Sequence, residues 1–191
     1  MRTICIIFLF IPLLCQSQYS DSLATRFLTL SKGISDVEKL IDIIGEDALK
    51  NESFDYVPTI NPLNPKKLKR FSDGFGMRFH PIDKEDKQHL GLDISAKAGT
   101  PIHAAASGTV KRTKKSDSGY GNQVLIEHRY GFRTRYAHMY LFVVEKGQTI
   151  NKGDIIGYVG STGKSTGHHI HYEVWKNGKA IDPYPFCFLE D

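Results

Sequence analysis

The chain has 191 residues and a formal net charge of +4. This length accommodates one domain of ordinary size together with a smaller segment. The positive charge is small and evenly spread, so it does not indicate a nucleic-acid-binding protein. It does suit contact with an anionic polymer or a cell surface.

The first residues have the composition of a secretory signal peptide. Arg2 precedes an apolar run over residues 4–15, and small polar residues follow that run. The run is too short to cross a bilayer, which needs about 20 residues. We therefore expect residues 1–17 to be a signal peptide cleaved after Ser17. The mature chain would have no transmembrane span and would be secreted, to the periplasm or the cell envelope.

A lipoprotein signal is the alternative interpretation of residues 1–17. A lipoprotein signal would attach lipid to Cys15, although Leu14 is bulky where such signals have a small residue. Once the signal is removed, Cys187 is the one cysteine left in the sequence, so no internal disulfide can form. Its apolar neighbours indicate a packed small side chain.

Residues 18–50 are predicted to form a short helical arm. Gly33 interrupts the pattern and residues 35–38 read as a capping box, so two short helices fit as well as one. The arm could pack on its own domain, or it could dock a protein partner through a short coiled coil. The prediction rests on apolar residues that alternate at intervals of four and three, namely Leu23, Phe27, Leu30, Ile34, Val37, Ile41 and Ile44.

The composition changes twice after the arm. Residues 51–69 contain three prolines and little periodicity, which predicts a linker. From residue 70 to residue 191 the chain consists of short β-rich runs separated by glycine turns. This pattern indicates an all-β domain, either a sandwich or a barrel.

The stretch GSTGKST, residues 160–166, invites comparison with a phosphate-binding loop. The first glycine of that motif is missing, because Tyr158 occupies its position. A phosphate-binding loop also needs a helix after the lysine, whereas HHIHYEVW follows here and favours a strand. A nucleotide site is therefore rejected.

Histidines are the stronger chemical signal. On a strand, His169 and His171 point to the same face, because side chains alternate with period two. His89 and Asp93 lie four residues apart, about 13 Å in a straight strand, and Gly91 between them lets the backbone bend. Nitrogen and carboxylate ligands without thiolates suit zinc, and three protein ligands leave a position open for catalysis.

A further histidine, His138, lies in TRYAHMY, where alternation places it on one strand face with Thr134 and Tyr136. The sequence has no H-E-x-x-H helix to supply a glutamate as general base. We therefore expect histidine to move the proton in any hydrolysis, since its pKa lies near neutrality.

Several blocks of the sequence together resemble the M23 family of zinc metallopeptidases, of the lysostaphin and LytM type. They are FGMRFHP, HLGLD, AGTPI, YAH, GYVGSTG and TGHHIHYEV, which occur in the order of the family and cover residues 71–183. The resemblance implies a two-sheet antiparallel β sandwich over residues 70–191. It also implies a secreted zinc metalloendopeptidase that hydrolyses peptide bonds in peptidoglycan stems or crosslinks.

Residue by residue, the resemblance makes His89, Asp93 and His171 the ligands of one zinc ion, and His138 and His169 the catalytic histidines. It does not say which of the two is the general base. His168 replaces a residue that is often proline in the family, and by alternation it points away from the metal.

Two other positions keep open roles at this stage. His80 belongs to a shared block but is not a ligand in the family. Asn122 is first a turn residue, although the matching asparagine of related proteins lies near the metal.

Two rival functions remain to be weighed. The first is a non-catalytic module of the same fold that binds cell wall or activates another hydrolase; such relatives typically lack ligands or catalytic histidines, and this chain has all five. The second is a lipoyl-type carrier, suggested by AAASGTV and VEKGQTINKGDIIG. A carrier needs a modified lysine between those blocks, and residues 116–145 contain none. The carrier is therefore excluded.

Overall fold

The computed structural model describes residues 54–79 and 84–187. The chain divides into two units, Met1–Ser35 and Asp36–Asp191, and every described residue belongs to the second. The predicted signal peptide, the helical arm and His80 lie outside the described residues. They stay predictions.

The described residues form short strands and two 3₁₀ helices, with no α-helix among them. The helices are η2 (Phe54–Tyr56) and η3 (Tyr184–Cys187). The strands are β1 (Leu68–Asp73), β2 (Gly76–Phe79), β3 (Asp86–His89), β4 (Leu92–Ala96), β5 (Pro101–His103), β6 (Gly108–Lys114), β7 (Asn122–Glu127), β8 (Phe132–Phe142), β9 (Thr149–Ile150), β10 (Ile155–Val159), β11 (His169–Lys176) and β12 (Lys179–Ile181).

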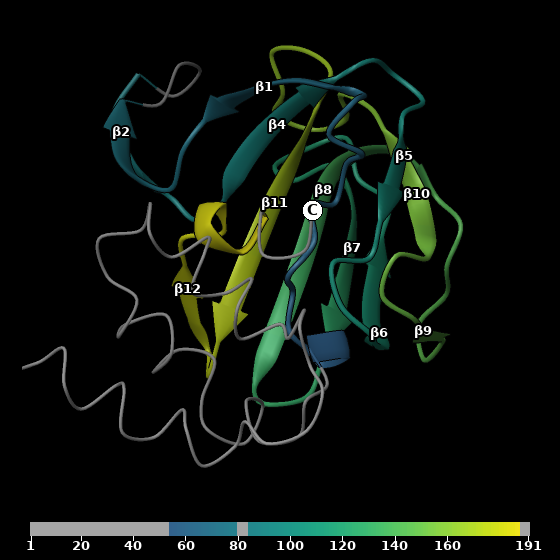
Figure 1. Ribbon diagram of the computed structural model, residues 1–191. Helices are drawn as coiled ribbons and strands as arrows, with labels where there is room; N and C mark the ends of the chain where they lie inside the picture. The colour runs from purple at the N-terminus through teal and green to yellow at the C-terminus, as the bar shows by residue number, and fades with distance from the viewer. Residues whose placement is uncertain (1–53, 80–83, 188–191) are drawn as a thin grey trace, which may run out of the picture. The chain divides into compact units, whose positions relative to one another are not determined.

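The strands of the described region pair antiparallel throughout, which confirms the all-β prediction. Ten of them join one sheet: seven follow the path β1-β4-β11-β8-β7-β6-β9, and β10, β5 and β12 branch from it. β2 and β3 form a separate hairpin. β11 lies between β4 and β8, near the centre of the sheet in Figure 1. The hairpin extends beyond β1 on one side of this sheet (Figure 1).

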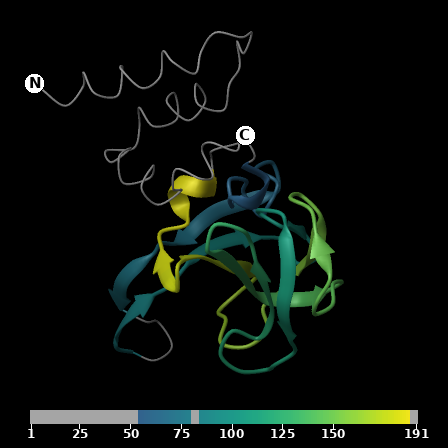
Figure 2. The same cartoon turned by 90° about the horizontal axis from the view of Figure 1, so that it is seen from below.

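The sheet branches at β8, the longest described strand, with 11 residues. Its first part pairs with β11 and β7, whereas its last part, from Met139 to Phe142, pairs with β10. β10 also pairs with β5, so these two strands continue the same ladder instead of forming a detached second sheet. The view turned by 90° shows how strongly the strands curve (Figure 2).

One face of the central strands forms the core. Ile170, Tyr172 and Val174 alternate along β11 and are fully buried. The ring of Tyr172 packs on that of Tyr136 from β8, with centroids 5.4 Å apart. Burying two such rings supplies a large apolar area to the core. The other face of β11 is thereby left to His169 and His171.

Part of the predicted linker packs on the β domain. Val57 and Leu63 are fully buried, and the backbone N–H of His103 donates to the carbonyl of Pro62. The Lys152 ammonium also donates to the carbonyl of Phe54. Residues 54–67 therefore stabilise the sheet, although their prolines and irregular pattern suggest a tether.

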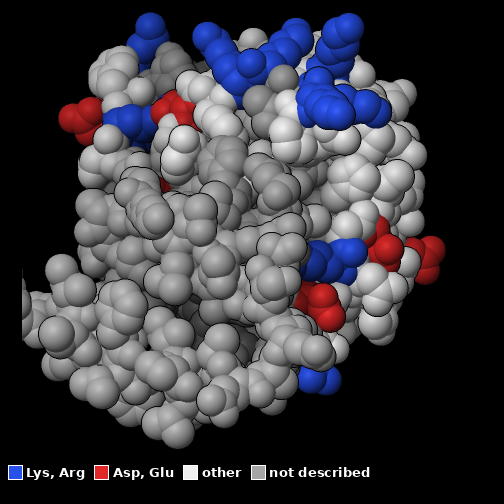
Figure 3. All heavy atoms as spheres, in the orientation of Figure 1, with Lys and Arg blue, Asp and Glu red and all other residues white. Residues whose placement is uncertain are grey.

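The surface carries both signs of charge. Figure 3 shows Lys and Arg side chains gathered along the upper edge of one face, above β1 and β4. The exposed basic residues at the start of β1 include Lys66, Lys67, Lys69 and Arg70. Among the described residues, no helix has the length and hydropathy that crossing a membrane requires.

Candidate metal centre

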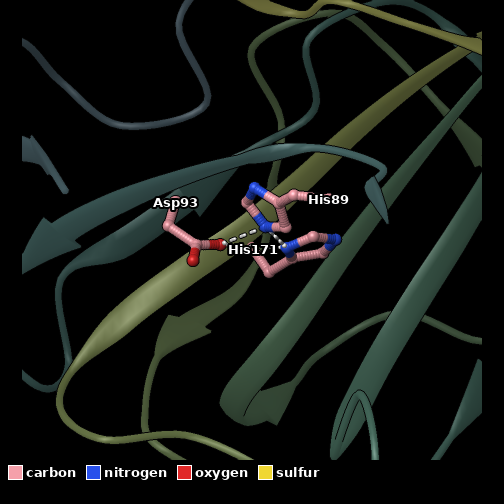
Figure 4. A group of neighbouring side chains, drawn as sticks. All are labelled: His89, Asp93 and His171. Atoms are coloured by element: carbon pink, nitrogen blue, oxygen red, sulfur yellow. Dashed lines mark hydrogen bonds and ion pairs between the residues drawn. The ribbon is translucent and has the colours of Figure 1, made fainter. Parts of the chain in front are cut away.

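Three side chains from separate segments converge on one point (Figure 4). His89 ends β3, Asp93 lies in β4 and His171 lies opposite Asp93 in β11. The Nδ1 atom of His171 lies 2.9 Å from both Nε2 of His89 and Oδ1 of Asp93. His89 Nε2 lies 3.2 Å from the same carboxylate oxygen. The three residues predicted as ligands are thus brought together.

Hydrogen bonds on the outer side of the His89 and His171 rings determine which ring nitrogen of each can bind a metal ion. Nδ1 of His89 lies 2.6 Å from the carbonyl oxygen of Gly74, which can only accept, so the proton is on Nδ1. Nε2 of His171 lies 3.0 Å from Oε1 of Glu173, which places its proton there. The nitrogens that face each other, Nε2 of His89 and Nδ1 of His171, contact Asp93 through protons in the absence of metal and are the ones that can offer lone pairs to a metal ion.

This arrangement fits a cation. Two lone-pair nitrogens and a carboxylate oxygen within 3.2 Å repel one another unless positive charge lies between them. Zinc bonds of about 2.0 to 2.2 Å in a tetrahedron separate ligand atoms by about 3.4 Å, so these side chains need to move apart only slightly. Donor type, tautomers and separations all suit a metal ion with nitrogen and oxygen ligands.

The surroundings of Asp93 keep it ionised. Burial acts to raise the pKa of Asp93, but hydrogen bonds from His171 and His89 outweigh burial and hold that pKa well below its usual value. The other carboxylate oxygen lies 3.8 Å from the guanidinium of Arg78, which is also paired with Asp73 at 3.0 Å. Asp93 therefore offers an anionic oxygen to the metal position.

His138 reaches the site by a route that strand alternation does not predict. Simple alternation would put it on the core side with Thr134 and Tyr136, which are fully buried. The pairing of β7 with β8 has a register shift in this region, and His138 has a φ of 57°. Such a bulge reorients a side chain. His138 therefore lines the groove together with His171, and the predicted shared face is wrong.

His138 and His169 form a pair beside the metal ligands. Their ring centroids lie 4.8 Å apart. Nδ1 of His138 donates to the carbonyl of Thr162 at 2.7 Å, and Nδ1 of His169 donates to that of Gly167 at 2.8 Å. In the neutral form of both rings, Nε2 is therefore the nitrogen that carries the lone pair. The His169 Nε2 lies 3.8 Å from Oδ1 of Asp93, next to the metal position.

Burial lowers the pKa of His138 to about 4, an effect that its bond to Thr162 reduces only in part. Its imidazole is therefore neutral near pH 7. A neutral ring with its free nitrogen in the groove can accept a proton from a bound water molecule.

The glycine-rich loop of residues 160–168 positions these histidines. Its Thr162 supplies the carbonyl that His138 bonds, and its Gly167 supplies the one that His169 bonds. Gly163 has a φ of 72°, and the N–H of Lys164 donates to the carbonyl of Gly119. The loop thus forms one wall of a groove of about 380 Å³ that contains all five predicted site residues.

The remaining sequence candidates lie elsewhere. His168 precedes β11, is exposed and is not among the residues that line the groove, in agreement with its exclusion from the ligand set. The side chain of Asn122 accepts from the N–H of Ser116 at 3.1 Å and donates to the carbonyl of Tyr140 at 3.0 Å. Asn122 is therefore the first residue of β7 and not a turn residue as predicted, and its side chain connects the loop before β7 to β8.

The sequence reasoning missed a buried carboxylate behind the metal ligands. Glu173 is fully buried, and its Oε1 accepts the Nε2 proton of His171. Burial acts to raise its pKa, but the His171 hydrogen bond and the charge of Arg135 lower that pKa overall. The signal was present in the sequence, because the alternation that joins His169 to His171 continues to Glu173.

Gly91 is required because of close packing. A Cβ atom at this position would collide with the carbonyl oxygen of Tyr172 and lie 3.0 Å from Cε1 of His171. The chain between His89 and Asp93 therefore crosses β11 at a distance that only glycine allows.

We expect Gly91→Ala to weaken metal binding and to lower stability by about 1 to 3 kcal/mol, the usual effect of overpacking. Gly74→Ala is the matched control, since a Cβ there meets nothing within 4 Å. Chelator-competition titration and thermal melting would measure both effects. Wild-type zinc affinity in Gly91→Ala would contradict this account of the close approach.

An antiparallel β domain with a His-Asp-His cluster and two more histidines in one groove defines a metal-site protein of the hydrolase type. The model of peptidase family M23 matches residues 87–183. The chain belongs to this family. The family and the cluster together support a metal cofactor, which is zinc in this family.

Curated relatives match more than half of the chain. The DD-carboxypeptidase/endopeptidase Mpg of Neisseria meningitidis is 43% identical over 121 residues, which cover 63% of this chain and 28% of that protein. The peptidoglycan DD-endopeptidase ShyA of Vibrio cholerae is 37% identical over 114 residues, which cover 59% of this chain and 26% of that protein. The chain thus spans less than a third of the length of these relatives.

Solved structures agree with the fold. A zinc-containing peptidase from Vibrio cholerae has a TM-score of 0.59 and 32% identity, over 64% of this chain and 37% of that one. The catalytic domain of lysostaphin from Staphylococcus simulans has a TM-score of 0.56 and 33% identity, over 64% of this chain and 92% of that domain.

Proposed function

We propose that this protein is a zinc metalloendopeptidase that hydrolyses peptide bonds in the stems or crosslinks of peptidoglycan. The observation that carries the proposal is the groove itself. It combines three converging ligand atoms with two histidines whose Nδ1 atoms are hydrogen-bonded to backbone carbonyls, so that Nε2 is left for proton transfer. A module that only binds cell wall would need neither His138 and His169 nor the hydrogen bonds that fix their tautomers.

His89, Asp93 and His171 would hold one zinc ion. When bound, zinc would lower the pKa of water and polarise the scissile carbonyl. The protein's own contribution is to hold these ligands in place. Gly74 and Glu173 fix the two imidazole tautomers, and Arg78 lies on the outer side of Asp93.

His138 and His169 would carry the proton steps. One Nε2 accepts a proton from the attacking water, and the resulting imidazolium stabilises negative charge on the carbonyl oxygen. The proton then passes to the departing amine, which leaves as the peptide bond breaks. The carbonyls of Thr162 and Gly167 keep both rings oriented throughout.

The substrate class is supported by the relatives. Mpg is named a DD-carboxypeptidase/endopeptidase, and ShyA and ShyC of Vibrio cholerae are named peptidoglycan DD-endopeptidases. The M23 family model matches residues 87–183, which include all five predicted site residues. The predicted signal peptide at residues 1–17 would place the protein outside the cytoplasm, where peptidoglycan lies.

Digestion of purified peptidoglycan by the zinc-loaded protein tests this proposal. We expect new amino termini and shorter muropeptides, identified by mass spectrometry. The reaction should stop on chelation and resume when zinc is restored. If the protein binds zinc and peptidoglycan but releases no new termini across several crosslink types, the non-catalytic module is the better description.

A further inference from the structure

The buried carboxylate of Glu173 is surrounded by donors from four side chains. Oε1 accepts from His171 Nε2 at 3.0 Å and from the Tyr120 hydroxyl at 2.6 Å. Oε2 accepts from Trp175 Nε1 at 2.6 Å and from the Arg135 guanidinium at 3.0 Å. Both oxygens are thus occupied, and the negative charge is paired with Arg135. Such complete satisfaction is what allows a carboxylate to be fully buried.

The sheet itself builds this cluster. Glu173 of β11 lies directly opposite Arg135 of β8 in the strand register. Tyr120 comes from the turn before β7, and the Arg135 guanidinium lies 4.5 Å from the centre of its ring. The hydrogen bonds around Glu173 therefore connect two central strands, β8 and β11, with the loop that borders the groove. The Glu173 carboxylate has little freedom to turn away from His171.

We propose that Glu173 is a positioning residue, clamped by Arg135, Trp175 and Tyr120, that holds His171 in the tautomer and orientation required for metal binding. The proposal rests on the metal site of the proposed function and adds to it a residue outside the ligand set. Glu173 acts only through His171, because its oxygen bonds the ring nitrogen on the far side from Asp93 and His89.

The physical reason lies in the two ring nitrogens. With the proton held on Nε2 by Glu173, Nδ1 has its lone pair directed at the cluster. The anionic acceptor also increases the electron density that the ring offers to a metal. Without the carboxylate, the proton can move to Nδ1, and the ring can rotate. Metal affinity should then fall even though all three ligands are present.

Glu173→Gln tests the proposal, because it keeps the size of the side chain and removes its charge. We expect the zinc dissociation constant, measured by competition with a chelator, to rise about 10- to 100-fold. Glu127→Gln is the matched control. It makes the same substitution at a strand carboxylate that pairs with Lys111 and Arg133 and does not line the groove, so its zinc affinity should stay close to that of the wild type.

Melting of the metal-free variants separates positioning from general stability. If affinity falls in Glu173→Gln but not in Glu127→Gln at comparable melting temperatures, the positioning role is supported. If zinc affinity is unchanged in Glu173→Gln, or follows stability equally in both variants, the proposal is wrong. Should Glu173→Gln fail to fold, Glu173→Asp keeps the charge but withdraws it from His171, and the same loss of affinity is expected.

These readouts need no peptidase activity. If wild-type protein binds zinc but cleaves no peptidoglycan, the proposed function fails while the positioning role can still be measured. If Glu173→Gln binds zinc normally in an active wild-type background, only the positioning role fails.

Discussion

His171→Ala is expected to abolish zinc binding and peptidoglycan hydrolysis together. His171 is the central ligand, since its Nδ1 lies 2.9 Å from the donor atoms of both His89 and Asp93. Removing it leaves two ligands, too few for a stable zinc site. We expect at least a hundredfold loss of affinity, beyond the 10- to 100-fold range typical of outer-shell partners.

Metal analysis and thermal melting would measure this result. A ligand at 100 times its dissociation constant stabilises the folded state by about 2.7 kcal/mol, so zinc should raise the melting temperature of the wild type but not of the variant. His168→Ala is the matched control, because this neighbouring histidine is exposed. Full zinc occupancy in purified His171→Ala would show that the ligand set is misassigned.

Asp93→Asn gives an independent check on the same site. It keeps the shape of the side chain but removes the charge that the two histidines stabilise. A neutral amide oxygen is a weaker zinc ligand than a carboxylate. We therefore expect weaker zinc binding here as well, with the fold retained.

Substitution of His138 or His169 is expected to lower the rate of hydrolysis without loss of zinc. His138→Ala and His169→Ala should keep zinc, yet each should lose hydrolysis of crosslinked muropeptides by about 10²-fold or more, the scale of general acid–base groups. Neither ring is among the three convergent ligands, and both present Nε2 to the groove. The double variant should lose less than the product of the two single losses, because both rings act in one site.

His103→Ala is the control for this pair, since His103 is a half-buried histidine of β5 that does not line the groove. Initial rates on a purified crosslinked muropeptide, with zinc content measured on the same samples, would test the expectation. Loss of zinc in His169→Ala would exchange the roles of His169 and His171. Wild-type rates in both single variants would remove the histidines from the mechanism.

Much of this site can be predicted from the sequence because strand geometry is local. The period-two alternation of a strand places His169 and His171 on one face, and the groove contains both. The exposure of His168 does not follow from this rule, which would place it on the buried face with Ile170; it is exposed because β11 begins only at His169. The alternation also reaches Glu173, although only a carboxylate whose partners are known can be recognised as a clamp.

The route by which His138 enters the groove depends on the partners of its strand. Alternation assigns it to the core with Tyr136, whereas the register shift between β7 and β8 and the left-handed backbone at His138 turn it outward. A bulge arises when two strands pair with unequal spacing, which no single segment encodes.

Residue types and local spacing in the sequence by themselves determined the all-β class, the histidine and aspartate chemistry and the shared face of His169 and His171. Only the tertiary structure decided how these groups meet. It packed residues 54–67 on the sheet, although their prolines predict a linker. It also surrounded Glu173 with Tyr120 and Arg135, which are distant in sequence. The physical reason is that burial and cross-strand register depend on contacts between remote segments, whereas alternation and ligand chemistry are properties of neighbouring residues.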